Sequence, residues 1–421
     1  MPRLAPPLDP VTVLLDGEPV IAERGEPVAA ALVAAGHLAL ARSPKFHRPR
    51  GPACMRAACD GCLARVDDEP NVMTCRVPAA EGTRVETQNV VGSRKTDLLR
   101  MSDWFFAEGM NHHELFAGVP GVQRVMQAFA RRVAGLGKLP KEAAPAREAR
   151  RREVDVLVVG SGPSGMAVAT HCARKGRGVE VLEEDLVWGG SVRALPRGQR
   201  EPWEPLVAAF GELASSGRVT LRARTTAAAV YADEVLVAGD AGIEVVHART
   251  LVLAPGAHDG VLDFEGNDLP GVMSARAGAR LLAGGVVAGA QVVVAIADGA
   301  PYGDVFGRAC AELRAPCEVV VVRGTPVRAR GTSRVRDVTV ATEEGAQQLA
   351  CDLLLVDARR APAYELCAQG GATLEHERRG FVSRAPRGRI RAGVFAAGEV
   401  VGTPLRPDAV WSEAKVIAEQ A

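Results

Sequence analysis

The sequence has almost no net charge and no uninterrupted apolar run of membrane-spanning length. Its 51 Lys and Arg residues against 50 Asp and Glu residues give a net charge of +1, which excludes the electrostatic surplus typical of nucleic-acid or anionic-lipid binders. The most apolar stretch, residues 281–297, contains three glycines and a glutamine, and predicts a helix end, a turn and a buried strand. The first residues show no apolar core of a secretion signal. We therefore expect a cytoplasmic protein that binds no nucleic acid and does not insert directly into a membrane.

The sequence also lacks a recognisable set of catalytic side chains. We find no nucleophile triad, no evident general base and no hydrolytic metal site, so no catalytic residue is assigned to this chain. Beyond residue 92 the cysteines are scattered and form no C-x-x-C pair, which argues against a disulfide reductase; they are Cys172, Cys310, Cys317, Cys351 and Cys367.

Four cysteines lie close together near the N-terminus. Cys54, Cys59, Cys62 and Cys75 have the spacing C-x4-C-x2-C-x12-C, which is typical of a plant-type [2Fe–2S] cluster loop. Zinc is the main alternative, but structural zinc sites usually pair their ligands as two short knuckles. Disulfides are a further alternative, and nothing in the sequence suggests an oxidising compartment. The spacing therefore favours a [2Fe–2S] cluster with these four thiolates as its ligands.

The pattern around these cysteines predicts an α+β domain. Residues 11–22 read as a hairpin around Asp16-Gly17, and residues 26–38 as a helix with a proline near its first turn. A β-grasp ferredoxin has the same order of elements: a hairpin, a helix, a cysteine loop and a strand. We place this domain at residues 1–92. Residues 93–152 are expected to form a helical connector and linker.

From residue 153 to 421 the sequence predicts a Rossmann-type α/β domain. A strand at 154–159 leads into a glycine turn, a helix at 166–175 and a strand at 179–182 that ends at Glu183. This is the order of the adenine-dinucleotide fingerprint, in which the phosphates lie at the helix N-terminus and the acid binds the ribose. The candidate binding residues are Gly160, Ser161, Gly162, Pro163, Ser164, Gly165, Glu183 and Glu184. An acid at the end of the second strand favours FAD or NAD over NADP.

Later segments resemble the two-dinucleotide flavoproteins and favour FAD. The strand that ends at Gly256 resembles their Ala-Thr-Gly strand, Gly190 belongs to a Gly-Gly pair like theirs, and Gly398-Glu399 resembles their Gly-Asp motif. The resemblance implies that Glu399 contacts the ribityl chain of FAD, while NAD or ATP remain alternatives for the site. The second nucleotide half, at about residues 275–365, lacks a G-x-G-x-x-G and is expected to be degenerate.

As a whole, the chain resembles the α-type subunits of multisubunit flavin amine oxidases and dehydrogenases: sarcosine oxidase, hydrogen cyanide synthase, opine oxidase and archaeal-type proline dehydrogenase. The motifs are His47-Arg-Pro-Arg-Gly51, Asn71-Val-Met-Thr-Cys75, Asp103-Trp-Phe-Phe106 and Ala134-Gly-Leu-Gly137. The chain departs from the family by ending at Ala421, so we expect no folate-binding half and one iron–sulfur centre. It also has Ala58 where a glycine usually precedes the second cysteine, which predicts backbone strain or altered hydrogen bonding to sulfur.

The resemblance implies an oxidoreductase subunit in a hetero-oligomer. The catalytic partner would be a flavin-containing subunit of the D-amino-acid-oxidase type that acts on a CH–NH group, with FMN as a further candidate at the partner interface. Our leading hypothesis is electron transfer between flavin and the [2Fe–2S] cluster of this chain. The alternatives are a self-contained NAD(P)H-dependent flavin/iron–sulfur reductase and a nucleotide-binding redox scaffold without its own catalysis.

Overall fold

The structure is a computed structural model, and it describes residues 3–43, 46–101, 121–122, 124–125, 148–297 and 302–421. The chain forms two compact units, each built from separate stretches of sequence. Unit 1 comprises residues 1–144, 262–296 and 314–356, and unit 2 comprises residues 145–261, 297–313 and 357–421. Most of the connector expected at 93–152, including the motifs Asp103-Trp-Phe-Phe106 and Ala134-Gly-Leu-Gly137, lies outside the described residues.

The N-terminal part of unit 1 is the predicted β-grasp domain. Its mixed sheet has the order β2-β1-β7-β5-β6, and α1 (Val28–Ala34) packs with all seven of its residues buried. The strands are β1 (Pro10–Leu15), β2 (Glu18–Glu23), β5 (Leu63–Val66), β6 (Glu69–Met73) and β7 (Arg84–Glu86). Asp16 and Gly17 form the predicted hairpin turn with φ of 50° and 85°, a conformation that both residues tolerate.

The rest of unit 1, residues 262–296 and 314–356, contains most of the segment predicted as the second nucleotide half. A four-stranded sheet has the order β15-β21-β16-β17, and a separate antiparallel sheet follows as β18-β19-β20. The elements are β15 (Val272–Ser274), α7 (Ala275–Ala283), β16 (Gln291–Ile296), β17 (Glu318–Arg323), β18 (Thr325–Gly331), β19 (Val335–Thr342), β20 (Gly345–Ala350) and β21 (Leu353–Asp357). The end of α7, the turn and the buried strand β16 confirm what residues 281–297 predict.

The β-grasp domain and the second nucleotide half contact each other within unit 1. The backbone N–H of Ser274 donates to the carbonyl of Ala53, one residue before Cys54, at 2.9 Å. Arg50 forms an ion pair of 3.4 Å with Asp268. The start of the cysteine loop is therefore held by residues more than 200 positions later in the sequence.

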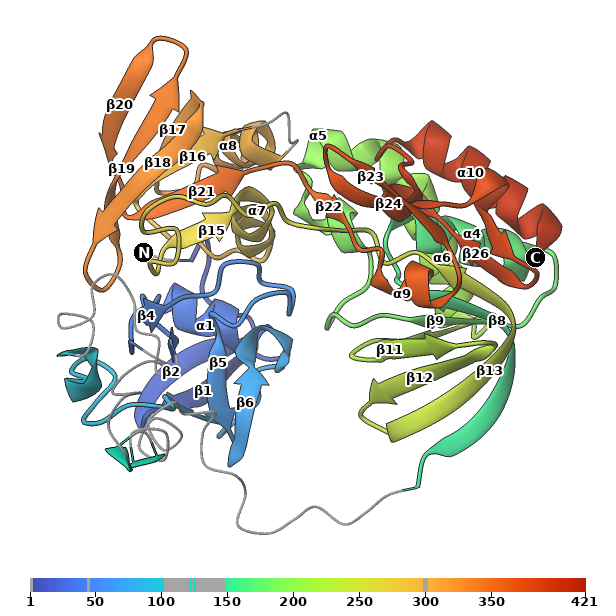
Figure 1. Cartoon of the computed structure of the whole chain (residues 1–421), viewed down its shortest axis with the longest axis horizontal. Helices are drawn as coiled ribbons and strands as arrows, with labels where there is room; N and C mark the ends of the chain where they lie inside the picture. Colours follow the sequence, from blue (N-terminus) through green and yellow to red (C-terminus); the bar gives the residue numbers. More distant parts are fainter. Residues whose placement is uncertain (1–2, 44–45, 102–120, 123, 126–147, 298–301) are drawn as a thin grey trace. The chain divides into compact units, whose positions relative to one another are not determined.

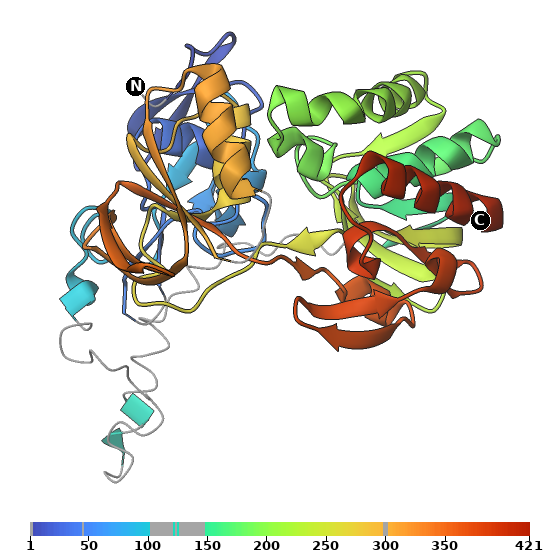
Figure 2. The ribbon, with the colours of Figure 1, turned by 90° about the horizontal axis from the view of Figure 1, so that it is seen from above.

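Unit 2 is built on a parallel sheet in the order β10-β9-β8-β13, and β26 continues it beside β13. Helix α4 packs on β8 and β9, α6 packs on β10, and α10 packs on α4 (Figures 1 and 2). The elements are β8 (Arg150–Val159), α4 (Pro163–Arg174), β9 (Val179–Leu182), α6 (Glu204–Ser215), β10 (Val219–Arg222), β13 (Gly242–Leu253), β26 (Val394–Ala396) and α10 (Pro407–Gln420). This is the predicted strand–turn–helix–strand order of a Rossmann-type domain.

Smaller elements complete unit 2. An antiparallel meander continues the sheet from β13 through β12 to β11. The remaining elements are β11 (Thr226–Tyr231), β12 (Glu234–Gly239), α5 (Arg197–Arg200), β14 (Ala257–His258), α8 (Tyr302–Leu313), β22 (Ala361–Pro362), α9 (Glu365–Gln369), β23 (Thr373–Glu377), β24 (Gly380–Arg384) and β25 (Arg389–Arg391). Within the described ranges, none of the helices has both the length and the apolar character needed to span a membrane.

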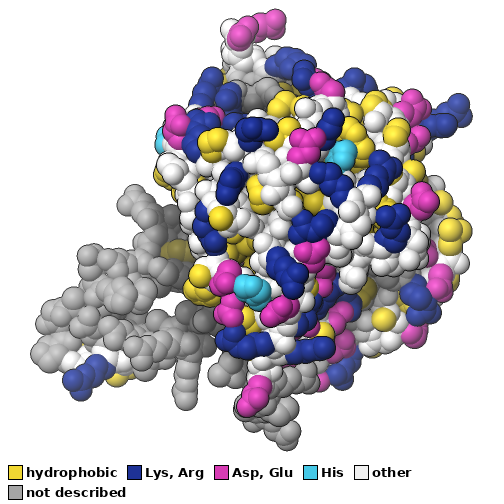
Figure 3. Space-filling model, turned by 90° about the vertical axis from the view of Figure 1, so that its right-hand side faces the viewer, with side chains coloured by type: hydrophobic (Ala, Val, Ile, Leu, Met, Phe, Trp, Pro, Cys, Tyr) yellow, Lys and Arg dark blue, Asp and Glu magenta, His cyan; other side chains and the backbone are white. Residues whose placement is uncertain are grey.

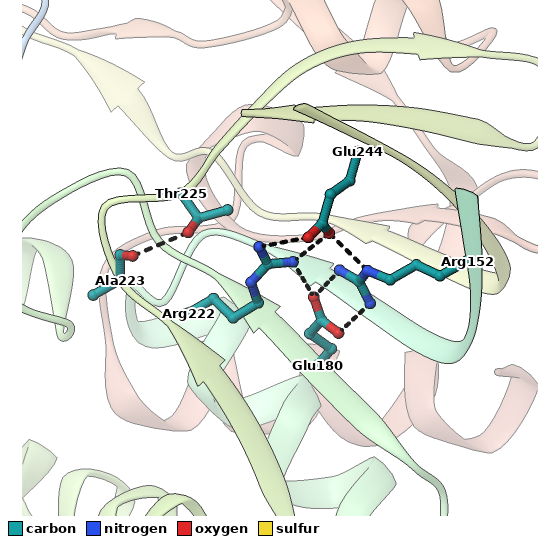
Figure 4. Close-up of polar contacts among 6 residues, drawn as sticks. All are labelled: Arg152, Glu180, Arg222, Ala223, Thr225 and Glu244. Atoms are coloured by element: carbon teal, nitrogen blue, oxygen red, sulfur yellow. Dashed lines mark hydrogen bonds and ion pairs between the residues drawn. The ribbon is translucent and has the colours of Figure 1, made fainter. Parts of the chain in front are cut away.

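Four charged side chains form a ring on the sheet of unit 2 (Figure 4). Arg152 donates to both oxygens of Glu180 at 2.6 Å and to Glu244 at 2.7 Å. Arg222 donates to Glu244 at 2.8 Å and to Glu180 at 3.2 Å. Each arginine thus lies between the same two carboxylates, so the charges in this largely buried ring balance. Such alternation limits the cost of removing the charges from water.

Candidate functional site

The four cysteines of the N-terminal loop come together in the β-grasp domain. Cys54, Cys62 and Cys75 are buried and Cys59 is partly exposed. Cys75 lies in a short 3-10 turn directly after β6, and this turn is fixed to the loop because Thr74 Oγ1 donates to the carbonyl of Cys62 at 2.9 Å. The fold therefore gathers the distant fourth cysteine beside the other three.

The thiols are arranged as two pairs. Cys54 hydrogen-bonds with Cys59, and Cys75 with Cys62. The hydrogen bond from Cys54 lowers the pKa of the Cys59 thiol to about 6. Among the described residues no three His, Cys, Asp or Glu side chains surround a single metal-ion position. Two pairs suit the two irons of a [2Fe–2S] cluster better than the single tetrahedron of a zinc site.

Backbone N–H groups of the loop point at the sulfur atoms. Ala58 donates to Cys54 Sγ at 3.2 Å, Arg56 donates to the same sulfur at 3.4 Å, and Ala57 donates to Cys75 Sγ at 3.3 Å. Thiolates that carry negative charge are stabilised by such donors, which also tune the potential of a bound cluster. The donor set and the paired thiols fit a [2Fe–2S] cluster, although ligation by these four residues stays a prediction.

The backbone strain expected at Ala58 lies at other residues of the loop. Met55 and Ala57 have φ of 52° and 61°, while Ala58 is not among the residues with positive φ. A left-handed conformation is costly for residues with a Cβ. The resemblance to plant-type loops predicts a strained backbone at Ala58. In the structure the left-handed residue is the preceding one, Ala57.

The glycine turn of unit 2 has the geometry of a dinucleotide-binding turn. Gly160 has φ of 95°, and a Cβ on it would lie 2.4 Å from the carbonyl oxygen of Ala254. A Cβ on Gly165 would lie 1.9 Å from the carbonyl oxygen of Gly160, so α4 packs closely on β8 there. A Cβ on Gly162 would meet no atom within 4 Å, which leaves space for a phosphate above the backbone.

Glu183 lies beside this turn, at the end of β9. Its carboxylate accepts hydrogen bonds from the backbone N–H of Ser161 at 3.0 Å and from the Ser161 hydroxyl at 2.5 Å. The backbone N–H of Asp185 donates to its other oxygen at 2.9 Å. The next residue, Glu184, is half-buried. This is the position from which an acid contacts an adenosine ribose, and binding by these residues stays a prediction.

The other predicted glycines also approach the N-terminus of α4, which begins at Pro163. A Cβ on Gly190 would lie 2.8 Å from Gly162 Cα, and a Cβ on Gly398 would lie 2.6 Å from Ser164 Oγ. Both glycines have positive φ. The Gly-Gly pair and the Gly-Glu motif therefore line the same helix end. Gly256, with φ of 77°, follows β13 as the resemblance implies.

Glu399 makes an ion pair that the sequence did not reveal. Its two oxygens accept from Arg360 at 2.8 Å and 3.1 Å. The guanidinium of Arg360 also lies over the ring of Tyr302, 5.2 Å from its centroid. Arg360 and Glu399 are 39 positions apart, and no local pattern links them. Contact between Glu399 and a ribityl chain stays a prediction.

A second carboxylate missed by sequence reasoning is Asp357, at the end of β21. It is buried and accepts a hydrogen bond of 2.5 Å from the backbone N–H of Gly303 in the first turn of α8. Burial raises the pKa of Asp357 to about 6. The carboxylate occupies the helix end where a second dinucleotide would place its phosphates. The turn before this helix, residues 298–301, lies outside the described residues.

The connection after β17 also differs from a complete nucleotide half. Only Gly324 separates β17 from β18, so no helix follows the second strand. In a doubly wound half a crossover helix covers the sheet at this point. The degeneracy of residues 275–365 stays a prediction.

Comparison with known proteins identifies both domains. Residues 9–90 match the family described as "2Fe-2S iron-sulfur cluster binding domain", and residues 154–294 match the family "Pyridine nucleotide-disulphide oxidoreductase". Sarcosine oxidase subunit alpha of Rhizobium meliloti (strain 1021) is 31% identical over 300 residues, covering 64% of this chain and 30% of the relative. The same subunit of Corynebacterium sp. (strain P-1) is 30% identical over 313 residues, covering 69% of this chain and 28% of the relative.

The chain is similar to sarcosine oxidase α subunits. It spans less than a third of the length of these relatives. The resemblance on which the sequence analysis relied is therefore confirmed, and the two domains give the cofactors as a [2Fe–2S] cluster and FAD. The crystal structure of L-proline dehydrogenase from P. horikoshii has the same fold, with a TM-score of 0.73 and 20% identity, covering 99% of this chain and 74% of that chain.

Proposed function

We propose that this chain is the electron-transfer subunit of a multisubunit flavin-dependent amine or amino-acid dehydrogenase or oxidase. The observation that carries the proposal is the arrangement of the loop thiols as two pairs, in a chain that also holds a dinucleotide-binding turn. When bound, FAD exchanges one or two electrons and a [2Fe–2S] cluster exchanges one. The paired thiols of the loop would hold the cluster, and the glycine turn before α4 would hold the dinucleotide.

The nucleotide-binding residues favour a resident dinucleotide in unit 2. Gly162 leaves room for a phosphate at the N-terminus of α4, and Glu183 offers two carboxylate oxygens beside the turn. Glu183 also disfavours a 2′-phosphate, because a second negative charge there would be repelled. The acid leaves FAD and NAD as candidates, and we assign FAD because Gly190 and Gly398, from the segments that resemble those of two-dinucleotide flavoproteins, line the same helix end.

The alternative of a self-contained NAD(P)H-dependent reductase requires a second dinucleotide site. Asp357 already accepts from the first turn of α8, and β17 passes into β18 without a helix. Both features work against a second pyrophosphate and adenosine. Electrons are better supplied by a partner subunit than by a pyridine nucleotide.

We propose that the partner is a flavin-containing subunit of the D-amino-acid-oxidase type in a cytoplasmic hetero-oligomer. The part of the chain that the structure describes contains no disulfide, which suits a reducing compartment. On the face drawn in Figure 3, basic, acidic and apolar side chains are interspersed, so a protein surface of mixed character fits it better than a nucleic acid.

Affinity purification of the tagged chain from its native host tests the proposal. We expect a second flavin subunit to co-purify, and we expect FAD with two irons and two sulfides per copy of this chain by mass analysis. Under anaerobic conditions, an amine or amino acid should bleach the flavin of the complex but not that of the chain alone. Bleaching of the isolated chain by NADH or NADPH would instead support the reductase.

A matched pair of variants separates the role of the cluster from that of the fold. Cys59→Ser should abolish electron delivery to an artificial one-electron acceptor while the amine still bleaches the flavin of the complex. Cys317→Ser changes a partly exposed cysteine outside the loop and should leave both steps intact. Equal loss in both variants would contradict the assignment.

A further inference from the structure

Arg193 lies beside the candidate nucleotide site without belonging to the adenine-dinucleotide fingerprint. It is in the short 3-10 helix η3 (Gly190–Ala194), which starts within the Gly-Gly pair of unit 2. This pair is fixed to the glycine turn, because the backbone N–H of Gly189 donates to the carbonyl of Ser161 at 3.1 Å. A Cβ on Gly189 would lie 3.1 Å from Cγ and 3.4 Å from Cδ of Arg193. The stem of Arg193 therefore crosses the glycine that is bonded to the turn.

The guanidinium of Arg193 is held only loosely by the protein. Its Nη1 lies 3.4 Å from the carbonyl oxygen of Val187 and 3.9 Å from a carboxylate oxygen of Asp185. Both distances are longer than those of a normal charge-assisted hydrogen bond. In the part of the chain that the structure describes, Arg193 makes no further hydrogen bond or ion pair. Since 40% of its side chain is exposed, the remaining donors are accessible to a ligand.

The charges around Arg193 explain why a cation is needed there. Three acids follow one another at the end of β9: Glu183, Glu184 and Asp185. Repulsion between these carboxylates and a pyrophosphate at the N-terminus of α4 disfavours binding. Burial lowers the pKa of Arg193, although the nearby charge of Glu183 opposes the shift. Arginine nevertheless stays protonated in proteins, and its planar guanidinium can bind two phosphate oxygens at once.

We propose that Arg193 is a phosphate-binding residue of the unit 2 site, and that it pairs with the diphosphate of an adenosine 5′-diphosphate group. FAD, NAD and ATP all contain this group. The inference thus rests on the proposed binding of an adenine nucleotide by unit 2, but not on the choice of FAD. To take a phosphate, the side chain gives up only its two long contacts with Val187 and Asp185.

The affinity of the full chain for its resident nucleotide tests this role. The chain is purified with its cofactors, and the bound nucleotide is identified by mass analysis. Its dissociation constant is measured from the free nucleotide that passes an ultrafilter at a series of protein concentrations. Arg193→Met keeps an unbranched apolar stem but removes the charge, and it should weaken binding about 10- to 100-fold. Arg193→Lys keeps the charge and should recover part of the affinity.

Salt dependence separates a phosphate contact from a merely structural role. Dissolved salt screens the attraction between the guanidinium and a phosphate. The affinity of the wild type should therefore fall more steeply with NaCl concentration than that of Arg193→Met. A loss of affinity that is the same at every salt concentration would contradict a charge contact.

The control is Arg197→Met in helix α5, which changes an arginine whose side chain is 85% exposed. It should bind the nucleotide as the wild type does. Equal dissociation constants for wild type and Arg193→Met, or an equal loss in Arg197→Met, would overturn the proposal. NAD or ATP as the resident nucleotide would overturn the assignment of FAD, while weaker binding by Arg193→Met would still support the role of Arg193. A wild type that retains no adenine nucleotide would overturn both.

Discussion

The carboxylate of Glu413 on α10 accepts a hydrogen bond of 2.8 Å from the backbone N–H of Gly398. The hydroxyl of Thr403 donates to its other oxygen at 2.5 Å. Burial raises the pKa of Glu413. Gly398 lies so near the N-terminus of α4 that a Cβ on it would come within 2.6 Å of Ser164 Oγ. The partly buried carboxylate of Glu413 therefore holds the Gly-Glu motif against the helix end to which the dinucleotide is assigned.

Glu413→Ala is therefore expected to destabilise unit 2 by about 1–3 kcal/mol, because it leaves a buried N–H without an acceptor. The FAD content per chain after gel filtration should fall as well. Glu413→Gln keeps an acceptor oxygen and should retain most of the FAD. Glu419→Ala, on an exposed residue of the same helix, serves as the control. If it lost as much FAD as Glu413→Ala, the effect would belong to the helix and not to the hydrogen bond.

The ring of Figure 4 predicts strongly non-additive effects. Glu244→Leu removes one of two carboxylates and leaves Arg152 and Arg222 poorly compensated, which should cost about 3–5 kcal/mol of unfolding free energy. Arg222→Met together with Glu244→Leu removes one charge of each sign and should cost less than Glu244→Leu alone. Urea unfolding of Glu244→Leu, of Arg222→Met and of the double variant measures the difference. Simple additivity of the two single changes would show that the four charges do not act as one unit.

Sequence reasoning succeeded where the determining residues are close together in the chain. The cysteine spacing, the hairpin turn at Asp16-Gly17 and the strand–turn–helix around Gly160 are local patterns, because each depends on the conformation of a short segment. The structure adds contacts between distant residues. Glu413 reaches Gly398 from another element, and Arg360 pairs with Glu399 across 39 positions.

The grouping of the chain into units was equally hidden from the sequence. A run of short strands and helices from residue 153 onward reads as one continuous domain, but residues 262–296 and 314–356 pack with the N-terminal domain. Contacts such as Ser274 to Ala53 have no signature in composition or periodicity. The position of the left-handed residues in the cysteine loop was hidden for the same reason, since it depends on how the loop reaches all four thiols.

Asp357 predicts a pH dependence of stability. Burial raises its pKa from the ordinary value of 3.8 to about 6, so the folded state binds the proton more tightly than the unfolded state. Stability from this group is therefore present below pH 3.8 and is lost as the pH rises to about 6. The loss amounts to at most about 3 kcal/mol.

Asp357→Asn should remove this dependence and still accept from Gly303. Relative to the wild type, the variant should become progressively more stable between about pH 4 and pH 6. The difference in unfolding free energy should stop changing above about pH 6, where Asp357 of the folded wild type has lost its proton. Thermal unfolding at a series of pH values measures it. Asp263→Asn, on an exposed residue, should follow the wild type. A constant difference between Asp357→Asn and wild type across the series would show that Asp357 does not titrate in this range.

The two adjacent alanines of the cysteine loop are expected to respond to glycine in opposite directions. Ala57 has φ of 61°, and a left-handed residue with a Cβ costs about 1–2 kcal/mol. Ala57→Gly removes that cost from the folded state. The greater conformational freedom of glycine in the unfolded chain costs about 0.4–1 kcal/mol, so the substitution should still stabilise the loop. Ala58 has no positive φ, so Ala58→Gly gains nothing in the folded state and should destabilise by about 0.5–1 kcal/mol. The urea concentration at which half of the visible circular dichroism of the cluster is lost should rise for the first variant and fall for the second. The resemblance to plant-type loops predicts instead that glycine stabilises the loop at residue 58. The signs of the two shifts therefore decide whether the left-handed residue of the loop is Ala57.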